Sequence, residues 1–433
     1  MSWTRPRTLG EAQTIVSGLL AVGLTAVDPR RKVAESLVAD PPTAGNEPLM
    51  VVAIGKAATA MAAGARDVLG DRISAGIILT KDGHSADPLD DFFIFEAAHP
   101  VPDQRGVDAT RTIIDALAGL DAGAIVLTLL SGGGSSLLEL PRPPVTLADL
   151  QVTTSLVLRA GAPIEHLNAV RGELSMVKGG GLRRQMGRAR CITLILSDVL
   201  GNDPRVIASG PTIHRTPDPE GALRLLHQYD LSSRLPASVL DALSGDQLLD
   251  ESGLDETERD EFRILADNDV LIDAIVAEAE RLGLNTSIAW RRQEGEAREL
   301  GRSFARKIGH SEDDVDMVIG GGEATVTVRG NGNGGRNTEF TLAAGLELTH
   351  ATTGDRWAVA SIASDGQDGS VDAAGAITSA ASIRATGEGG LDPLAALAEN
   401  DSGGYFDRTG ELIRTGPTGT NVNDVMIGLR LAG

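Results

Sequence analysis

Cysteine, lysine and aromatic residues are scarce in this chain of 433 residues. Its single cysteine, Cys191, excludes an intramolecular disulfide and a multi-cysteine metal site. Because Cys191 opens the apolar run CITLIL, we expect a buried strand thiol rather than a nucleophile. Aromatic residues make up 3% of the chain, so the core must consist of Ala, Val, Leu and Ile, which favours close-packed α/β layers.

Positive charge is also scarce, since the formal net charge is −21 and the isoelectric point is about 4.7. This balance argues against binding to nucleic acid or to an anionic membrane surface. No apolar run approaches the ~20 residues that span a bilayer, and the segment MSWTRPRTLGEAQ lacks the apolar core of a signal peptide. We therefore expect a cytoplasmic protein with neither a membrane nor a nucleic-acid partner.

Short apolar runs alternate with amphipathic segments through the first half of the chain, a pattern typical of alternating strands and helices. Runs that are apolar throughout indicate strands buried on both faces, and hence a largely parallel sheet. Repeated strand–helix–strand order predicts right-handed βαβ units in a doubly wound α/β fold. The predicted strands are 49–55, 75–80, the segment FFIFEAAHP, 124–130 and 191–199.

The alternation weakens between residues 215 and 260 and then resumes, so we place a domain boundary near 245. The sequence therefore predicts two α/β lobes, an N-terminal domain over 1–245 and a C-terminal domain over 246–433. Within the second lobe, the segment 316–330 predicts a strand, a glycine turn and another strand.

Four glycine clusters interrupt the chain where buried strands are expected to end. They occupy 131–136, 178–181, 320–323 and 330–337. Glycine lets a ligand approach the backbone N–H groups closely, and each cluster adjoins a Ser, Lys, Glu or Arg, so we interpret them as contacts to a phosphate-rich ligand. Polar residues at strand carboxyl ends in both halves predict a site in the cleft between the two lobes.

The first cluster and Lys56 are the strongest binding candidates in the N-terminal lobe. Lys56 follows the first predicted strand and begins a helix, where a cation is disfavoured unless an anion compensates it, although an ordinary surface lysine fits the position too. The cluster lacks the Gly-Lys-Ser/Thr ending of a Walker A loop, and a tight strand-to-helix turn is the alternative interpretation. Its predicted binding residues are Ser131, Gly132, Gly133, Gly134, Ser135 and Ser136, to which Lys178 and Glu323 of later clusters are added.

Asp198 lies at the end of the strand CITLILS. A carboxylate there can accept the proton of a substrate hydroxyl or hold Mg²⁺, which prefers carboxylate and phosphate oxygens. A helix N-cap is the structural alternative. Asn202 and Asp203 offer further oxygen ligands in the same loop, so we predict Asp198 and Asp203 as metal ligands.

The fourth cluster matches G-x-G-x-x-G at Gly330, Gly332 and Gly335, with Asp355 20 residues further on. Asp355 precedes the next strand, whereas the ribose-binding acid of a dinucleotide site lies at the strand's carboxyl end. We therefore interpret Arg336, directly before a helix, as a guanidinium that clamps a phosphoryl group.

A second acidic loop, SDGQDGSVDAAG, carries Asp365, Asp368 and Asp372. Its spacing is similar to that of a calcium loop but lacks the closing Glu. The loop is compatible with two roles. It could position Mg²⁺ or substrate, or it could form a capped turn. The histidines show no metal-ligand spacing, and His99 alone lies in a site-like loop.

Nine segments, in order along nearly the whole chain, resemble the glycerate 2-kinases. They are IGKAA, AHPVPD, SGGGSS, HLNAVRGELSMVKGGGL, SDVLGNDPRVIASGPT, GGEATVTV, GGRNTEF, SDGQDGSVDAAGA and TGPTGTNVNDV. The resemblance implies a Rossmann-like N-terminal kinase domain and a C-terminal MOFRL domain. It also implies transfer of phosphate from ATP, with Mg²⁺, to the 2-hydroxyl of D-glycerate or a related hydroxy acid.

The resemblance further implies catalytic roles for Lys56, Asp198 and Arg336, and a homodimer is compatible with it. This chain departs from the family's usual Arg-Lys-His by carrying Gly172 and Glu173 after Arg171. Two alternatives stay open at this point, an NAD(P)H-dependent hydroxypyruvate reductase and a non-catalytic protein that binds a sugar acid or a nucleotide.

Overall fold

The computed structural model describes residues 3–432 except 43–44, 46, 86–88 and 246–259. It divides into two compact units, each of which is described by itself. One comprises Pro29–Leu265, and the other comprises Met1–Asp28 together with Ala266–Gly433.

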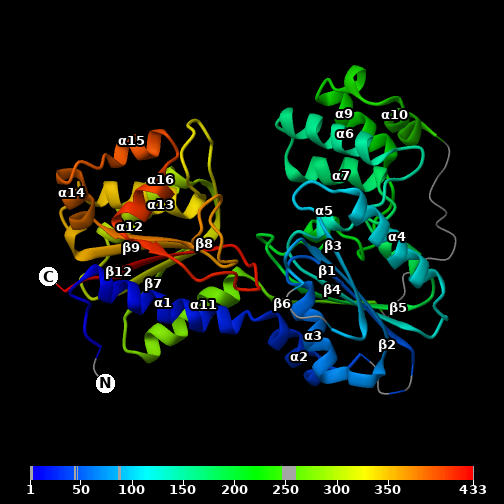
Figure 1. Ribbon diagram of the computed structural model, residues 1–433, viewed down its shortest axis with the longest axis horizontal. Coiled ribbons are helices and arrows are strands. Elements are labelled where there is room, and N and C mark those ends of the chain that lie inside the picture. Colours follow the sequence, from blue (N-terminus) through cyan, green and yellow to red (C-terminus); the bar gives the residue numbers. More distant parts are fainter. Residues whose placement is uncertain (1–2, 43–44, 46, 86–88, 246–259, 433) are drawn as a thin grey trace. The chain divides into compact units, whose positions relative to one another are not determined.

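The first unit contains a six-stranded sheet in the order β3-β2-β1-β4-β5-β6, in which β1 to β5 are parallel (Figure 1). The predicted parallel α/β sheet and its five strands are confirmed. Since the strand order reverses between β1 and β4, the crevice for a ligand is expected at the carboxyl ends of these two strands. The strands are β1 (Leu49–Ile54), β2 (Ile73–Lys81), β3 (Phe92–Ala97), β4 (Ile125–Leu130), β5 (Arg190–Leu196) and β6 (Glu261–Ala266).

Two groups of helices accompany this sheet. One group packs with the sheet and consists of α2 (Pro29–Ala39), α3 (Ala58–Leu69), α4 (Gln104–Ala118), α5 (Gly134–Leu137) and α8 (Gly181–Gln185). The other forms a separate small apolar core and appears as a cap at the top of Figure 1. Its members are α6 (Leu147–Arg159), α7 (Ile164–Leu174), α9 (Pro219–Gln228) and α10 (Ala237–Ser244). The rest of the irregular stretch predicted after α10 lies largely outside the described residues.

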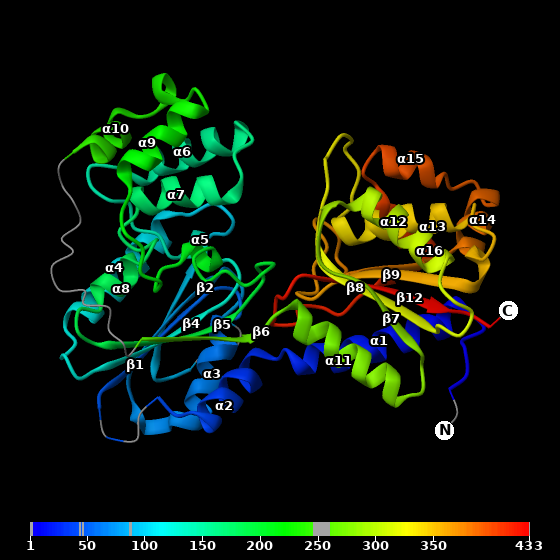
Figure 2. The ribbon, with the colours of Figure 1, turned by 180° about the vertical axis from the view of Figure 1, so that it is seen from behind.

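The second unit is a three-layer α/β/α arrangement around a mixed sheet in the order β11-β10-β9-β12-β8-β7. Only the β7–β8 pair is parallel among the described pairs. Figure 2 shows α12 and α13 on one face of this sheet and α1 and α11 on the other. The strands are β7 (Thr286–Glu296), β8 (Met317–Thr325), β9 (Trp357–Ala363), β10 (Gly375–Ser379), β11 (Leu412–Ile413) and β12 (Asp424–Arg430). The helices are α1 (Leu9–Ala26), α11 (Asn268–Arg281), α12 (Ala297–Gly309), α13 (Arg336–Leu348), α14 (Ala380–Glu388), α15 (Pro393–Ala398) and α16 (Ser402–Thr409).

Helix α1 belongs with the second unit although it precedes the first in the sequence. Gly23 permits its close approach to α11, since a Cβ at Gly23 would lie 2.7 Å from Cγ1 of Ile275. The boundaries observed at 28/29 and 265/266 therefore differ from the predicted one near 245. Among the described residues, α1 is also the single helix whose length and composition would let it cross a membrane, and in this structure it packs against α11.

The predicted glycine turn within 316–330 is wrong, because β8 runs without interruption through Gly320, Gly321 and Gly322. These glycines serve close packing. A Cβ at Gly321 would lie 2.0 Å from Oδ1 of Asn268, and one at Gly322 would lie 1.9 Å from the carbonyl oxygen of Gln293. Glu323 lies in the same strand with an exposed side chain, so this cluster is not a ligand loop at a strand end.

Candidate functional site

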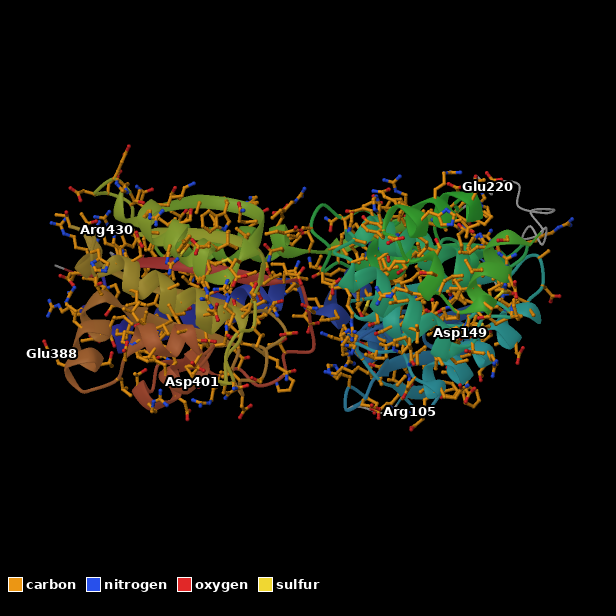
Figure 3. All side chains as sticks on the ribbon, turned by 90° about the horizontal axis from the view of Figure 1, so that it is seen from above. Arg105, Asp149, Glu220, Glu388, Asp401 and Arg430 are labelled. Atoms are coloured by element: carbon orange, nitrogen blue, oxygen red, sulfur yellow. The ribbon has the colours of Figure 1, made fainter. Side chains whose placement is uncertain are left out.

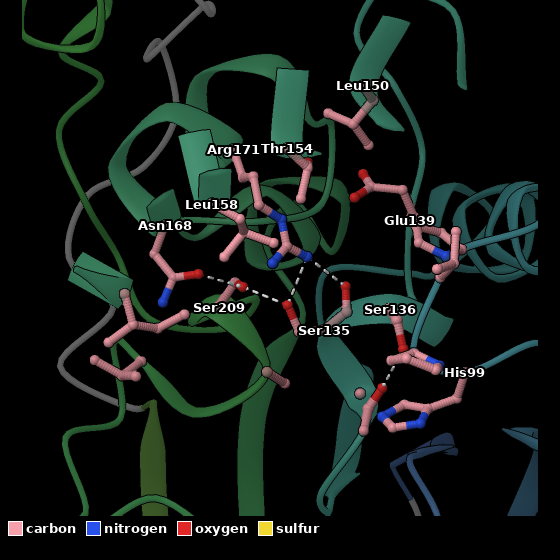
Figure 4. A pocket seen from close by; sticks show the side chains of 18 of the residues that line it. His99, Ser135, Ser136, Glu139, Leu150, Thr154, Leu158, Asn168, Arg171 and Ser209 are labelled. Atoms are coloured by element: carbon pink, nitrogen blue, oxygen red, sulfur yellow. Dashed lines mark hydrogen bonds between the residues drawn. The ribbon is translucent and has the colours of Figure 1, made fainter. Parts of the chain in front are cut away.

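A cavity of about 710 Å³ opens at the carboxyl ends of β3, β4 and β5 in the first unit (Figure 4), and Lys56, which follows β1, is not among its lining residues. Its walls come from the loop after β3, the glycine loop after β4, helices α6 and α7, and the segment from Asp198 to Ser209. Cavities of roughly 300–1,000 Å³ hold drug-sized ligands, so this one has room for a nucleotide and a small acid together.

The glycine loop 131–136 lies where the sequence predicts it, directly after β4, and its last three residues form the first turn of α5. Gly133 has a φ of 84°, which a residue with a side chain adopts only under strain. Two bonds tie this loop to the end of β1, from the Lys56 amide to the Gly132 carbonyl at 2.9 Å and from the Ala57 amide to Ser131 Oγ at 3.0 Å. A Cβ at Gly133 would lie 3.3 Å from Cγ of Lys56, so the Lys56 side chain lies against this loop as well.

Lys178 supports the glycine loop from behind and does not line the cavity. Its ammonium is wholly buried and donates to the carbonyl oxygens of Ser135 and Leu138. It also pairs with Glu139 at 3.3 Å. Burial lowers the pKa of Lys178 to about 8, while the charge of Glu139 opposes the shift. Lys178 thus holds the backbone that a ligand would meet, instead of meeting the ligand as the sequence predicted.

The glycines after Lys178 also bond to the protein. The amides of Gly179 and Gly180 donate to the carbonyl oxygens of Ser209 and Gly210 at 2.9 and 2.8 Å. This cluster therefore joins two loops rather than presenting these N–H groups to a phosphate.

The two predicted metal ligands lie in different surroundings. Asp198 follows β5 and lines the cavity. Asp203 does not line it, and its carboxylate accepts several bonds from the exposed Arg205, the shortest at 2.7 Å. The hydrogen bonds to Arg205 lower the pKa of Asp203 although partial burial opposes the shift. The described residues contain no group of three or more His, Cys, Asp and Glu side chains placed to hold a metal.

His99 lines the cavity from the loop after β3. Burial lowers its pKa to about 4, with smaller contributions from the charges of Lys56 and Lys81. The imidazole is therefore neutral near pH 7 and adds no positive charge to the cavity.

The sequence interpretation missed two cavity residues on α7, Asn168 and Arg171. They are three residues apart and therefore share one face of the helix. Arg171 donates from Nη2 to the carbonyl oxygen and the hydroxyl of Ser135, at 2.9 and 2.7 Å (Figure 4). The i, i+3 spacing of two polar residues on a helix beside a glycine cluster was the available signal.

Arg336 lies in the second unit, at the first residue of α13, and lines a cavity of about 440 Å³. Its guanidinium binds Asp424 in a bidentate pair at 2.6 and 2.8 Å. Burial disfavours its charged form, but the charge of Asp424 outweighs this and raises the pKa of Arg336 above its ordinary value. The group is a fixed cation at every physiological pH.

The glycines before Arg336 do not form a dinucleotide loop. The Gly332 amide donates to the Glu399 carbonyl at 2.8 Å, and the Asn333 amide donates to Asp401, labelled in Figure 3, at 3.1 Å. A Cβ at Gly330 would lie 2.4 Å from the Glu399 backbone. These glycines thus permit packing against the segment before α16.

The acidic loop after β9 does not gather its carboxylates at one point. Asp368 is buried and caps α13, accepting from the amides of Asn337 and Thr338 at 2.8 Å each. Burial raises its pKa although these bonds oppose the shift. Asp372 is exposed. The loop therefore contributes a capping residue, which is one of the two interpretations that its sequence allowed.

Comparison with known proteins gives matches over most of the chain. Residues 15–244 match the family described as a domain of unknown function, DUF4147, and residues 316–424 match the MOFRL family. The D-glycerate 2-kinase of Thermotoga maritima is 39% identical over 94% of this chain and 95% of that protein. The chain belongs to the glycerate 2-kinase family.

Other relatives carry related names. The glycerate 2-kinase of Pyrococcus horikoshii is 35% identical over 88% of this chain and 86% of that protein. A protein of Agrobacterium vitis, named provisionally as a hydroxypyruvate reductase, is 36% identical over 96% of this chain and 93% of its own length. The crystal structure of glycerate kinase from Thermotoga maritima superimposes with a TM-score of 0.86 at 37% identity, covering 98% of this chain and 100% of that one.

The family departure at Gly172 and Glu173 is compensated locally. Glu173 is buried and pairs with Arg215, and it accepts from the Asp218 amide at 3.0 Å. A Cβ at Gly172 would lie 3.1 Å from the Arg215 guanidinium. Arg215 therefore occupies the space beside Gly172 and supplies a positive charge to this part of α7.

Proposed function

We propose that this protein is an ATP-dependent kinase that phosphorylates the 2-hydroxyl of D-glycerate, giving 2-phosphoglycerate and ADP. The observation that carries the proposal is the cavity at the carboxyl ends of β3, β4 and β5, which is lined by residues 132–136 and by Asp198. Lys56 packs against Gly133 of the same glycine loop. The proposal is supported by the glycerate 2-kinases among the relatives and by the similarity of this structure to that of glycerate kinase from Thermotoga maritima.

The transfer moves one phosphoryl group and one proton. The hydroxyl oxygen of the acid attacks the terminal phosphorus of ATP, the bond from that phosphorus to the bridging oxygen breaks, and ADP leaves. We assign Asp198 to accept or orient the hydroxyl proton, because it is the carboxylate at the end of β5 that lines the cavity. We assign Lys56 to the phosphate oxygens, because phosphoryl transfer depends on positioning and on neutralised charge.

The phosphates of ATP are assigned to the glycine loop, whose residues 132–136 line the cavity and whose Gly133 brings the backbone close. Ser135 and Ser136 add hydroxyls to the same wall. Lys178 acts indirectly, by fixing the carbonyl groups of Ser135 and Leu138. Glu323 has no assigned role, because β8 places it within a strand.

Magnesium fits Asp198 better than Asp203. Mg²⁺ is usually bound by one or two carboxylates together with substrate phosphates, and it would neutralise phosphate charge when bound. Asp198 is a carboxylate on the cavity wall. Asp203 would first have to exchange its bonds to Arg205. We therefore propose Asp198 as the protein ligand of the metal.

Arg336 is proposed as the second cation that stabilises the transferring group. Its bidentate pair with Asp424 presents a guanidinium of fixed orientation on its own cavity wall. We further propose that the protein acts in the cytoplasm, and a homodimer remains compatible with the sequence.

A hydroxypyruvate reductase activity is the second candidate, because two relatives from Agrobacterium vitis carry that provisional name. The hydrogen bonds and packing of the loop 330–335 speak against a dinucleotide there. One assay separates the two activities. Purified protein is incubated with MgATP and a panel of 2-hydroxy acids, and ADP and the phosphorylated acid are measured, while NADH oxidation by hydroxypyruvate is followed in parallel. ADP formation that depends on D-glycerate supports the kinase, and NADH oxidation without ADP formation overturns it.

A further inference from the structure

Four side chains on the cavity wall form one continuous chain of hydrogen bonds (Figure 4). Arg171 Nη2 donates to Ser135 Oγ at 2.7 Å. The Ser135 hydroxyl lies 2.6 Å from the Ser209 hydroxyl, and Ser209 donates to Oδ1 of Asn168 at 3.0 Å. Residues from α7, from the glycine loop and from the segment after β5 are thereby joined.

The direction of the protons in this chain follows from its two ends. Each hydroxyl carries one hydrogen, and the Ser209 hydroxyl donates its hydrogen to Oδ1 of Asn168. The Ser135 hydroxyl must therefore donate to Ser209 while accepting from Arg171. Every bond runs from the guanidinium toward the amide oxygen, so cooperative polarisation strengthens the donors at the far end.

Both ends of the chain keep donors that the protein does not use. Within the described part of the chain, the amide nitrogen of Asn168 has no acceptor. Arg171 likewise has no ion-pair partner there, and its hydrogen bonds to Ser135 use Nη2 alone. Burial lowers the pKa of Arg171 below its ordinary value, and Glu139 opposes that shift. A partly buried guanidinium without an ion-pair partner is costly, unless a ligand supplies a negative charge and further acceptors.

The few cationic side chains on this cavity wall suit a ligand that carries a single negative charge. Besides Arg171, the cavity lining contains one arginine, Arg159, whose side chain is exposed, and His99 is neutral near pH 7. The carboxylates of Glu139 and Asp198 lie on the same lining. At the Arg171 end of the wall, one guanidinium aided by neutral donors balances the single charge of a carboxylate. The planar fork of Arg also suits the planar carboxylate.

We propose that Arg171 and Asn168 form a carboxylate clamp that selects acid substrates for this cavity. Arg171 binds the carboxylate oxygens, and Asn168, polarised through Ser135 and Ser209, donates a further bond. The inference rests on the proposed kinase function, and it adds the residues that distinguish a hydroxy acid from a neutral alcohol. Gly172 and Glu173 leave this clamp intact, because Glu173 is paired with Arg215.

The test compares wild type, Arg171→Lys and Asn168→Ala in steady-state ADP release, with the acid and MgATP varied separately. Loss of charge-assisted hydrogen bonds worth about 1.5–3 kcal/mol corresponds to a 10- to 100-fold rise in KM for D-glycerate in Arg171→Lys. A rise of about 5-fold is expected for Asn168→Ala. The KM for ATP is expected to rise less than the KM for D-glycerate, since Arg171 reaches the proposed phosphate-binding residues only through Ser135. Glyceramide, which lacks the carboxylate, should be used equally well by wild type and Arg171→Lys.

Arg159→Lys is the matched control, because it changes an arginine of the same cavity outside the hydrogen-bond chain. Thermal melting of each variant shows whether the protein is folded. An unchanged KM for D-glycerate in folded Arg171→Lys, or a rise confined to ATP, overturns the clamp while leaving the kinase in place. Absence of ADP from wild type overturns the kinase instead. In that event calorimetry of D-glycerate binding decides the clamp, which requires weaker binding in both variants.

Discussion

Arg336 and Asp424 join the first residue of α13 to the first residue of β12 through two parallel hydrogen bonds. Nε lies 2.6 Å from Oδ2, and Nη2 lies 2.8 Å from Oδ1. Asp424 is wholly buried, and its Oδ1 also accepts from the Asn337 side chain at 3.0 Å. A strand of the sheet thus orients the guanidinium that opens the helix. The unit supplies a fixed cation whose direction depends on a residue far away in the sequence.

Replacing Asp424 with Asn should therefore disturb Arg336 without touching a substrate. We expect kcat to fall about 10- to 100-fold and stability to fall by about 2–3 kcal/mol, because the isosteric amide removes the charge that holds the guanidinium. Arg336→Ala should lower kcat by ~10³ or more. Steady-state kinetics and urea unfolding measure both effects. Glu347→Gln, which breaks the exposed pair with Arg306, is the control and should change neither by much.

The architecture of the first unit follows from the sequence more readily than that of the second. Runs such as IVLTLL in β4 are apolar throughout, and they pair in parallel as such runs predict. The run through Gly320–Gly322 carries the same glycine signal as the loop 131–136, yet it lies inside β8. Gly321 and Gly322 leave space for Asn268 and Gln293, which pack against β8 from other elements. A sequence does not reveal such neighbours before the fold is known.

Replacing Asp198 and replacing Asp203, both in the loop after β5, should have different effects on activity. Asp198→Asn is expected to lower kcat by about 10²–10⁴-fold, since the carboxylate on the cavity wall loses its ability to take a proton. It should also raise the Mg²⁺ concentration needed for half-maximal activity. Asp203→Asn frees the exposed Arg205 and should change kcat by less than about 10-fold. Equal losses in the two variants would contradict the assignment of Asp198.

Lys178 predicts a rise of stability with pH. Its pKa is lowered to about 8 from the ordinary value of 10.5, chiefly by burial. Between these values the unfolded chain binds the proton more tightly than the folded one, so unfolding becomes less favourable as the pH rises. Across the range between the two pKa values, the free energy of unfolding should rise by about 3 kcal/mol. Roughly 2 kcal/mol of this rise should appear between pH 8 and 9.5.

Urea unfolding of wild type and Lys178→Met at both pH values isolates this contribution, because the variant lacks the titrating group. The stability of wild type relative to the variant should increase at the higher pH. A constant difference would show that Lys178 titrates normally in the folded protein. The ammonium should still matter for activity below pH 8, where it bonds to the carbonyl oxygens of Ser135 and Leu138.

The positions of the candidate site residues in the fold were predictable from sequence where a polar residue follows a buried strand. Lys56, the loop 131–136 and Asp198 follow β1, β4 and β5 and lie at one edge of the first sheet. Lys178 shows the limit of this reasoning. The position of a lysine beside three glycines predicts a phosphate contact. Only the fold reveals that this lysine is buried and forms an ion pair with Glu139. Arg171 was equally hidden, because its role depends on Ser209 from another segment.

Glu173 and Arg215 form an ion pair between α7 and the segment before α9. Glu173 is 1% exposed, and its Oε2 has no hydrogen-bond partner in the described part of the chain. Arg215→Ala should therefore destabilise the protein by about 3 kcal/mol, because it leaves a buried carboxylate without its counter-charge. Adding Glu173→Gln to Arg215→Ala should recover much of this loss, since an amide needs no counter-charge. Urea unfolding of the two single variants and the double variant measures the coupling. Additive losses in the double variant would show that the ion pair with Arg215 does not stabilise Glu173 in α7.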